Sequence, residues 1–393
     1  MTKKRRIAHL DMDAFYASVA LLRYPDLRRK VLVIGGRNVP APVKKADGTW
    51  EYARLRDYVG RGVVTTASYE ARALGVFSAM GLMKAAQYAP DAYLLPADFQ
   101  AYRYYSRLFK EAVATVSDRI ENRGIDEIYI DLSHLAQSSM QLARRLQQVV
   151  WEATGLTCSV GISPNKLLAK IASDLNKPNG VCVLGQEEVP TVVWPLPVGK
   201  VNGIGPKSQQ KLARLGIHTV GDLAQASPPL LQRHFGLSYA KWLADAAQGK
   251  DDRPIVLASE PKSLSRERTF ERDLHVRHDR QRLTQFLEAI CGQLAQDLQQ
   301  KGYRAFTIGI KLRFDDFSTL TRDHSMDVPV VKQADLLHAA RQCLRRTQIR
   351  HRSLRLVGVR ASKLIAEVDC VRYDRLPVQL SFGDLACLDT KRD

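Results

Sequence analysis

Two runs, IAHLDMD at Ile7–Asp13 and IDEIYID at Ile125–Asp131, decide the fold. The first predicts a buried strand that ends in carboxylates, and the strict alternation of the second predicts a strand with one buried face. Adjacent strands of one sheet would bring Asp11, Asp126 and Glu127 together. Converging carboxylates repel one another unless a cation neutralises them, and Mg²⁺ prefers such oxygen ligands. The pattern therefore fits a divalent-metal site on a sheet, and a solvated acidic loop is the alternative.

Outward from these runs, helical and extended patterns alternate along the chain. Helices are predicted at residues 14–22, 99–116, 139–153 and 165–173, and further strands at residues 31–34 and 157–161. Strands joined by crossover helices in this order predict a βαββαβ, ferredoxin-like sheet. Residues 15–96 interrupt that sheet and are expected to form a subdomain on it. Within them, residues 37–61 are polar and poorly periodic, which indicates a long loop or hairpin.

The chain of 393 residues is strongly basic, with 59 lysines and arginines against 41 acidic residues, a net charge of +18 and a pI near 9.7. Half of this excess lies in residues 258–366, where 21 basic residues accompany 12 acidic ones. Net charge carries information about partners rather than fold. It favours nucleic acid here, with a membrane surface or a plain solvated basic face as the alternatives.

Cysteine spacing and hydropathy argue against several classes of protein. No two of the six cysteines form a CxxC pair, which argues against a zinc ribbon or a disulfide scaffold. The basic N-terminus is followed by no apolar signal-peptide core, and no apolar stretch reaches the ~18 residues of a membrane helix. These features predict a cytoplasmic, reduced protein with no membrane partner.

Six motifs follow one another along the chain. They are HLDMDAFYASV (His9–Val19), ASYEAR (Ala67–Arg72), IDEIYID (Ile125–Asp131), VGISPNK (Val160–Lys166), AKIASD (Ala169–Asp174) and KPNG (Lys177–Gly180). In this order they resemble the motifs of the Y-family DNA polymerases, closest to the bacterial DNA polymerase IV (DinB) branch, over residues 6–365. The resemblance implies template-directed DNA synthesis from dNTPs, at low fidelity and without proofreading, in translesion synthesis and DNA repair.

The resemblance also implies the metal chemistry. Asp11, Asp126 and Glu127 become the catalytic metal ligands, with the carbonyl oxygen of Met12 as a further ligand. They would hold two Mg²⁺ ions, or Mn²⁺ as the alternative, which activate a 3′-oxygen and stabilise the leaving pyrophosphate. Asp13 is expected to have a structural role.

Other residues of the motifs are expected around the incoming nucleotide. The expected triphosphate contacts are Thr66, Tyr69, Arg72 and Lys177. An arginine offers a planar fork suited to phosphate oxygens, and a lysine offers a compact charge. The ring of Tyr16 is expected against C2′ of the sugar, where a 2′-hydroxyl would clash with it. Phe15 is expected to pack beside this pocket.

Two segments are expected to hold primer-template DNA. VNGIGPK at Val201–Lys207 resembles a helix-hairpin-helix, in which glycines let the backbone approach a phosphate closely. Its candidate contacts are Gly203, Gly205 and Lys207. The basic segment 258–366 resembles the little-finger domain of the family, whose contacts position the duplex without reading sequence. Its candidate groove residues are Ser263, Ser265, Arg266, Arg268, Arg313, Thr321 and Arg322.

The C-terminal tail contains VQLSF at Val378–Phe382. It resembles the short peptide with which bacterial polymerases bind the sliding clamp, in which a glutamine precedes apolar anchors. The candidate clamp contacts are Gln379, Leu380 and Phe382. An ordinary apolar tail is the alternative.

The expected fold class is α+β and multidomain, in a monomer located in the bacterial cytoplasm on the nucleoid. The expected parts are a ferredoxin-like palm (1–14 and 97–189), small fingers (15–96), a helical helix-hairpin-helix thumb (190–253), an α/β little finger (254–366) and a tail (367–393). One alternative function is a catalytically inactive relative that acts as a DNA-binding adaptor. A nucleotide cyclase, which can share the palm and its two-metal chemistry, is a second alternative, but it has no need of the basic domain.

Overall fold

The motif strand at the N-terminus lies in the middle of a five-stranded sheet of order β11-β10-β1-β9-β8. Its strands are β1 (Ile7–Met12), β8 (Ile120–Asn122), β9 (Glu127–Asp131), β10 (Cys158–Ser163) and β11 (Val181–Val183). The computed structural model describes residues 5–349 and 351–368. They divide into an N-terminal unit that ends at Ser259 and a C-terminal unit that begins at Glu260.

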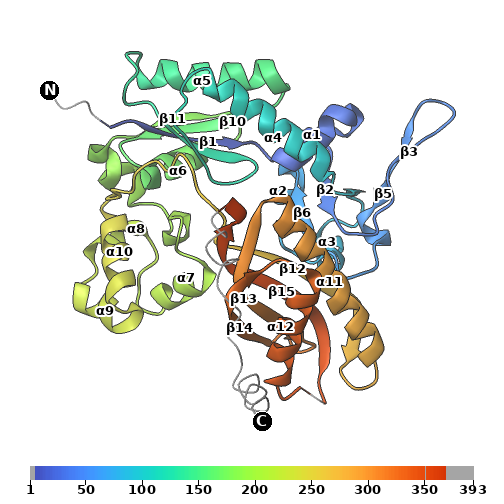
Figure 1. The fold of residues 1–393 in the computed structure, drawn as a ribbon. Helices are drawn as coiled ribbons and strands as arrows, with labels where there is room; N and C mark the ends of the chain where they lie inside the picture. The colour runs from blue at the N-terminus through green and yellow to red at the C-terminus, as the bar shows by residue number, and fades with distance from the viewer. Residues whose placement is uncertain (1–4, 350, 369–393) are drawn as a thin grey trace, which may run out of the picture. The chain divides into compact units, whose positions relative to one another are not determined.

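Two helices cover one face of this sheet, and a third covers the other. On β1, Ala8, Leu10 and Met12 point into a core shared with α4 (Phe99–Ala114) and α5 (Ser139–Thr154). Figure 1 shows α4 and α5 on the same side of the sheet. Helix α6 (Lys166–Leu175) packs on the opposite face. Strands β8, β9, β1 and β10 pair antiparallel in the ferredoxin-like order, which confirms that prediction.

The segment between β1 and α4 forms a smaller layer around a second sheet of order β5-β7-β2-β6. Its elements are α1 (Phe15–Arg23), η1 (Pro25–Leu27), β2 (Leu32–Gly35), β5 (Ala53–Arg54), η2 (Leu55–Asp57), β6 (Val64–Ala67), α2 (Tyr69–Ala73), α3 (Leu82–Tyr88) and β7 (Tyr93–Leu95). Residues 37–61 are more ordered than a loop. They contain a hairpin of β3 (Val43–Lys44) and β4 (Trp50–Glu51), and β5 joins the sheet by pairing with β7.

Short helices follow β11. They are η3 (Gln186–Glu188), η4 (Val189–Val193), η5 (Val198–Lys200), α7 (Pro206–Ala213), α8 (Val220–Gln225), α9 (Pro228–Phe235) and α10 (Leu237–Ala247). Helix α8 is capped by Thr219, whose hydroxyl accepts from the Asp222 amide at 3.1 Å in a capping box. Their apolar faces share one core with α6, so this part packs directly on the sheet layer.

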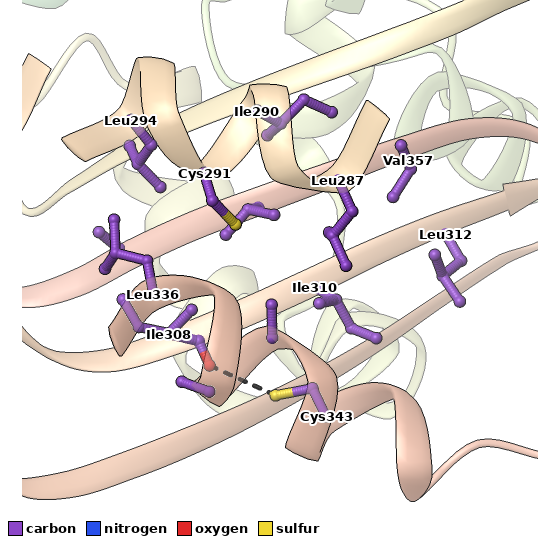
Figure 2. Packing of buried hydrophobic residues seen from close by; sticks show 14 of the residues in the cluster. Leu287, Ile290, Cys291, Leu294, Ile308, Ile310, Leu312, Leu336, Cys343 and Val357 are labelled. Atoms are coloured by element: carbon purple, nitrogen blue, oxygen red, sulfur yellow. Dashed lines mark hydrogen bonds between the residues drawn. The ribbon is translucent and has the colours of Figure 1, made fainter. Parts of the chain in front are cut away.

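The C-terminal unit is a four-stranded antiparallel sheet of order β12-β15-β13-β14, with two helices on one face. Its elements are β12 (Ser263–His275), α11 (Arg280–Gln300), β13 (Tyr303–Phe314), β14 (Thr319–Val330), α12 (Gln333–Arg345) and β15 (Ser353–Ala366). Figure 2 shows Leu287 and Ile290 of α11 and Leu336 of α12 packed against Ile308 and Ile310 of β13. The opposite face of the sheet carries no helix of this unit within the described residues.

Candidate active site

The carboxylates of the HLDMDAFYASV and IDEIYID motifs meet at the five-stranded sheet. Asp11 on β1 lies directly opposite Glu127 on β9 in the antiparallel register. The Met12 amide donates to the Asp126 carbonyl at 3.0 Å, which holds Asp126 beside the end of β1. The structure therefore brings together all three predicted carboxylates, and the Met12 backbone lies between them.

Two residues that the sequence motifs left without a role surround Glu127. The Nε2 atom of His9 lies 3.3 Å from Glu127 Oε2, and its Nδ1 atom lies 2.7 Å from the Ser173 hydroxyl. The ammonium of Lys170, on α6, contacts the same Glu127 oxygen. Ligand atoms of His9, Asp11 and Glu127 all lie within 4.8 Å of one another. The sequence held one signal for the place of His9: it lies two residues before Asp11 on a strand, and side chains two apart on a strand point to the same face.

The electrostatics of these carboxylates fit a bound cation. Burial and then the Asp11 charge raise the pKa of Asp126, which is the cost of crowding negative groups in a half-buried site. By contrast, the hydrogen bond from His9 and the Lys170 ammonium lower the pKa of Glu127 to about 2, although burial opposes the shift. Clustered oxygen donors whose negative charge is only partly neutralised are the ligand set that hard divalent ions require.

Lys177 also lies at this cluster. Its ammonium is 2.8 Å from Asp11 Oδ1 and 3.1 Å from Asp174 Oδ1. Burial opposes its charge, but the two carboxylates together raise the pKa of Lys177 above its usual value. Asp13, in contrast, is buried and accepts from the Ser159 hydroxyl at 2.7 Å and the Asn179 amide at 2.8 Å. These bonds give Asp13 the expected structural role.

Three of the four residues predicted to hold a triphosphate, Thr66, Tyr69 and Arg72, lie at the junction of β6 and α2. Tyr69 is the first residue of α2, and its buried hydroxyl oxygen has no hydrogen-bond partner among the described residues. Burial and then the Asp13 charge raise the pKa of Tyr69 to about 12, while Lys177 and Arg72 act in the opposite direction. The Arg72 guanidinium lies 5.0 Å from the Tyr69 ring centre, and Thr66 is buried on β6. An unsatisfied buried hydroxyl near two cations indicates a place for an anionic ligand.

Tyr16 belongs to a group of aromatic rings at the start of α1. Its ring stacks on Tyr102 of α4 with a centroid distance of 4.1 Å and an interplanar angle of 23°. Burial and the nearby Asp126 carboxylate raise the pKa of Tyr16, so the ring lies within electrostatic range of the carboxylate cluster. Phe15 is buried and points into the core against Phe109 at 6.4 Å. The Phe15 side chain therefore belongs to the core between the sheet and its helices.

The predicted helix-hairpin-helix residues lie on an exposed turn. Gly203 has a φ of +111°, and a Cβ there would lie 2.6 Å from the Trp242 ring, so only glycine fits. Gly205 caps the N-terminus of α7, with open space around the position of a Cβ. The side chain of Lys207 is exposed in the first turn of this helix. Free amides at such an N-terminus favour a phosphate.

The open face of the C-terminal sheet, the face without helices, holds some of the predicted groove residues. Ser265, Thr321, Lys311 and Arg360 line a shallow hollow there. Arg313 follows Lys311 by two residues on β13, so its side chain leaves the sheet on the same face. Acidic residues are interleaved with these cations. Asp323 pairs with Arg360 at 3.1 Å, and Glu267 pairs with Lys311 at 2.9 Å.

Three predicted groove residues point to the helical side of the same sheet instead. The Arg266 Nη2 atom lies 2.6 Å from Asp297 Oδ1 on α11, and Arg268 lies over the ring of Phe286 at 5.4 Å. Arg322 pairs in register with Ile310, a residue of the helix-covered core. The alternation of strand side chains thus divides the predicted set between two faces. The predicted clamp contacts Gln379, Leu380 and Phe382 lie outside the described residues.

Comparisons with known proteins agree with this architecture. The impB/mucB/samB family model matches residues 10–174, its C-terminal domain model matches residues 261–373, and the helix-hairpin-helix motif of the same family matches residues 186–217. DNA polymerase IV of Alkalilimnicola ehrlichii is 36% identical over 92% of this chain and 96% of its own length. DNA polymerase IV of Xanthomonas axonopodis pv. citri is 38% identical over 90% and 93%.

A solved structure shows the same fold. A Y-family DNA polymerase chimera of Dbh and Dpo4 superposes with a TM-score of 0.76 and 26% identity, over 92% of this chain and 99% of its own. No described helix is both long enough and apolar enough to cross a membrane. Near full-length identity above 30% together with this fold shows that the chain belongs to the Y-family DNA polymerases, in the DNA polymerase IV branch.

Proposed function

We propose that this chain is a template-directed DNA polymerase that copies damaged DNA from dNTPs, at low fidelity and without proofreading. The observation that carries the proposal is the register of β1 and β9, which sets Asp11 opposite Glu127 with Asp126 tied to the Met12 amide. Membership of the DNA polymerase IV branch supports the same activity. Asp11, Asp126 and Glu127 are the catalytic carboxylates.

The carboxylates, with the Met12 carbonyl oxygen, would hold two divalent cations, for which Mg²⁺ is the proposed ion and Mn²⁺ the alternative. When bound, such ions activate the 3′-oxygen of a primer and stabilise the leaving pyrophosphate. The protein supplies the charge balance around them. Lys177 contacts Asp11, and Lys170 contacts Glu127, so the ammonium groups neutralise these carboxylates in the protein alone.

The nucleotide is held from the β6–α2 junction. The buried Tyr69 hydroxyl has no partner among the described residues and lies within electrostatic range of Asp13 and Lys177. Arg72 is held in place because its Nε donates to the Ala67 carbonyl at 3.0 Å. We assign both residues, with Thr66 and Lys177, to the triphosphate. The Tyr16 ring is assigned to exclude a 2′-hydroxyl, with Phe15 behind it.

The domain roles follow from these assignments. Residues 1–14 and 97–189 act as the palm, 15–96 as the fingers, 190–253 as the thumb, 254–366 as the little finger, and 367–393 as a tail. DNA contacts are proposed at the backbone of Gly203 and Gly205 and at Lys207, where the φ of Gly203 supports a close approach. On the little finger, the open face with Ser265 and Arg313 is the favoured DNA surface.

Arg266, Arg268 and Arg322 leave the little-finger sheet on the other face. They are therefore left out of the DNA surface proposed on the open face. Clamp binding through Gln379, Leu380 and Phe382 and a location in the cytoplasm on the nucleoid complete the proposal.

Single-nucleotide primer extension with Mg²⁺ tests the function. Wild type should add dNTPs, Asp126→Ala/Glu127→Ala should lose extension by at least about 10³-fold, and both should bind primer-template equally. The double variant Glu111→Ala/Asp118→Ala removes two exposed carboxylates of the same unit and is the matched control. A wild type that binds primer-template but never extends it would replace the polymerase by the DNA-binding adaptor.

A further inference from the structure

We propose that Tyr102 and Phe99 are positioning residues that hold the Tyr16 ring and thereby set how strictly the site rejects ribonucleotides. The inference rests on the proposed function, since it assigns a partner to the sugar-excluding ring. Tyr102 stacks on Tyr16 at 4.1 Å, and Phe99 meets Tyr16 edge-on at 6.0 Å and 76°. The three rings close a triangle, because Phe99 also meets Tyr102 edge-on at 5.7 Å.

A ring excludes a hydroxyl by steric overlap only if it cannot swing away. Tyr16 is only partly buried and lies in the first turn of α1, so rotation of its ring toward solvent is opposed only by what packs against it. A stacked face and an edge contact fix the two side-chain torsions of a tyrosine in one rotamer. Groups that act at a site keep their geometry when their supporting neighbours are themselves locked. Tyr102 and Phe99 are the neighbours that α4 supplies, and Phe15 of α1 adds a tilted ring at 5.7 Å from Tyr16.

Tyr102 is itself immobile. Its side chain is 1% exposed and lies in the palm core, where its ring also meets Phe15 at 6.4 Å. Helix α4 begins at Phe99, and the Asp98 carboxylate caps it by accepting from the Ala101 amide at 3.0 Å. The position of the Tyr16 ring is therefore set by a helix some 85 residues further along the chain. Because Tyr102 is buried, it acts on the nucleotide through Tyr16 rather than by contact.

Loss of the Tyr102 ring would lower core stability in any protein, so stability alone is no test. The distinctive consequence is a change in sugar choice. A Tyr16 ring free to rotate should still allow dNTP incorporation, because a deoxyribose has no 2′-hydroxyl to exclude. The penalty against a ribose should fall.

The experiment compares kcat/KM for dCTP and CTP opposite template guanine in full-length variants. Tyr102→Leu and Phe99→Ala should each raise the CTP:dCTP ratio of kcat/KM about two- to tenfold, the range that the loss of one aromatic pair represents. Tyr102→Phe keeps the ring and should keep the wild-type ratio. Phe109→Leu removes another buried ring from the same helix and core without a ring contact to Tyr16, so it is the control for destabilisation.

Raised ratios in Tyr102→Leu and Phe99→Ala, with dCTP kinetics within about twofold of wild type, support the proposal. Phe99 is 49% exposed, so Phe99→Ala tests it even if Tyr102→Leu fails to fold. A wild-type ratio in Phe99→Ala, or an equal rise in Phe109→Leu, overturns it. Tyr16→Ala separates this from the proposed function: if Tyr16→Ala leaves the ratio unchanged, the sugar-excluding assignment of Tyr16 has failed instead.

Discussion

A buried ion pair beneath the five-stranded sheet should contribute strongly to the free energy of unfolding of the N-terminal unit. The Glu121 carboxylate of β8 is 4% exposed and contacts the ammonium of Lys166 on α6. It also accepts from the Val256 amide at 2.8 Å, while Arg123 lies 3.7 Å from its other oxygen. Val256 belongs to the segment that leads to the C-terminal unit, so Glu121 fastens this segment to the sheet. We consider Lys166→Met, which keeps the stem and removes the charge.

The loss can be sized from these contacts. Removing one member of a buried pair costs about 3–5 kcal/mol, because the other charge remains buried. This cost cannot exceed the free energy of protonating the carboxyl that remains, because a neutral carboxyl no longer needs a partner. A glutamic acid in water titrates near 4.3, so protonation costs about 3.7 kcal/mol at pH 7 and about 1 kcal/mol at pH 5. Lys166→Met should therefore destabilise the N-terminal unit by about 3–4 kcal/mol at pH 7 and by about 1 kcal/mol at pH 5.

Tryptophan fluorescence isolates the relevant unit. All four tryptophans of the chain, Trp50, Trp151, Trp194 and Trp242, lie in the N-terminal unit, so urea unfolding followed by their emission reports on it alone. The double variant Glu121→Gln/Lys166→Met removes both charges and should lie within about 1–2 kcal/mol of wild type at both pH values. A loss below about 1 kcal/mol at pH 7, or an equal loss at pH 7 and pH 5, would refute the reasoning.

Three further substitutions test other parts of the chain. Asp323→Asn releases Arg360 on the open sheet face, so DNA should bind about two- to fivefold tighter, and the slope of log Kd against log salt should steepen by about 0.9 in anisotropy titrations. Lys170→Met removes a group that lowers the pKa of Glu127. A lowered folded-state pKa stabilises the protein above about pH 4.5, and that stability is lost as the pH falls toward 2. The metal-free variant should therefore lose less stability than wild type between about pH 4.5 and 2, as measured by unfolding followed with circular dichroism. Gly203→Ala should cost about 1–3 kcal/mol in urea unfolding, because its φ is +111° and a Cβ would meet a tryptophan ring at 2.6 Å.

Each of these three has a matched control. Glu288→Gln removes an acidic charge that pairs with Arg341 between the helices, and it should leave the salt slope unchanged. Lys84→Met removes an exposed lysine of the fingers and should keep the acid profile of wild type. Gly205→Ala adds a Cβ into open space at a negative φ and should be tolerated. Equal behaviour of a variant and its control would contradict the corresponding contact.

Much of the palm could be predicted from local patterns. The alternation after Glu127 and the apolar run before Asp11 placed both strands to within about two residues, because period-two burial is written in neighbouring residues. The helix-forming stretch at residues 139–153 was equally clear, and α5 spans Ser139–Thr154. The strands within residues 37–61 could not be located from the sequence, because two-residue strands such as β5 are too short to show a period.

The proposed DNA-binding face shows what residue type alone does not predict, which is the face of the sheet that a side chain occupies. Ser265 and Arg266 are neighbours on β12 and were both predicted to line the groove, yet they point to opposite faces. Arginine is a good candidate for a phosphate contact by chemistry. Its partner is decided by α11, whose Asp297 lies 31 residues further along the chain and takes the Arg266 guanidinium.

The sequence by itself determined the chemistry of the site: which carboxylates, cations and aromatic rings are present, in what order, and on which kind of element each lies. Only the tertiary structure decided which of them meet. Asp11 faces Glu127 across 116 positions, Lys170 neutralises Glu127 from α6, and Tyr102 stacks on Tyr16 from α4. The reason is physical, since periodicity arises from neighbours a few residues apart, whereas strand register and helix packing depend on how distant segments bury their apolar faces together.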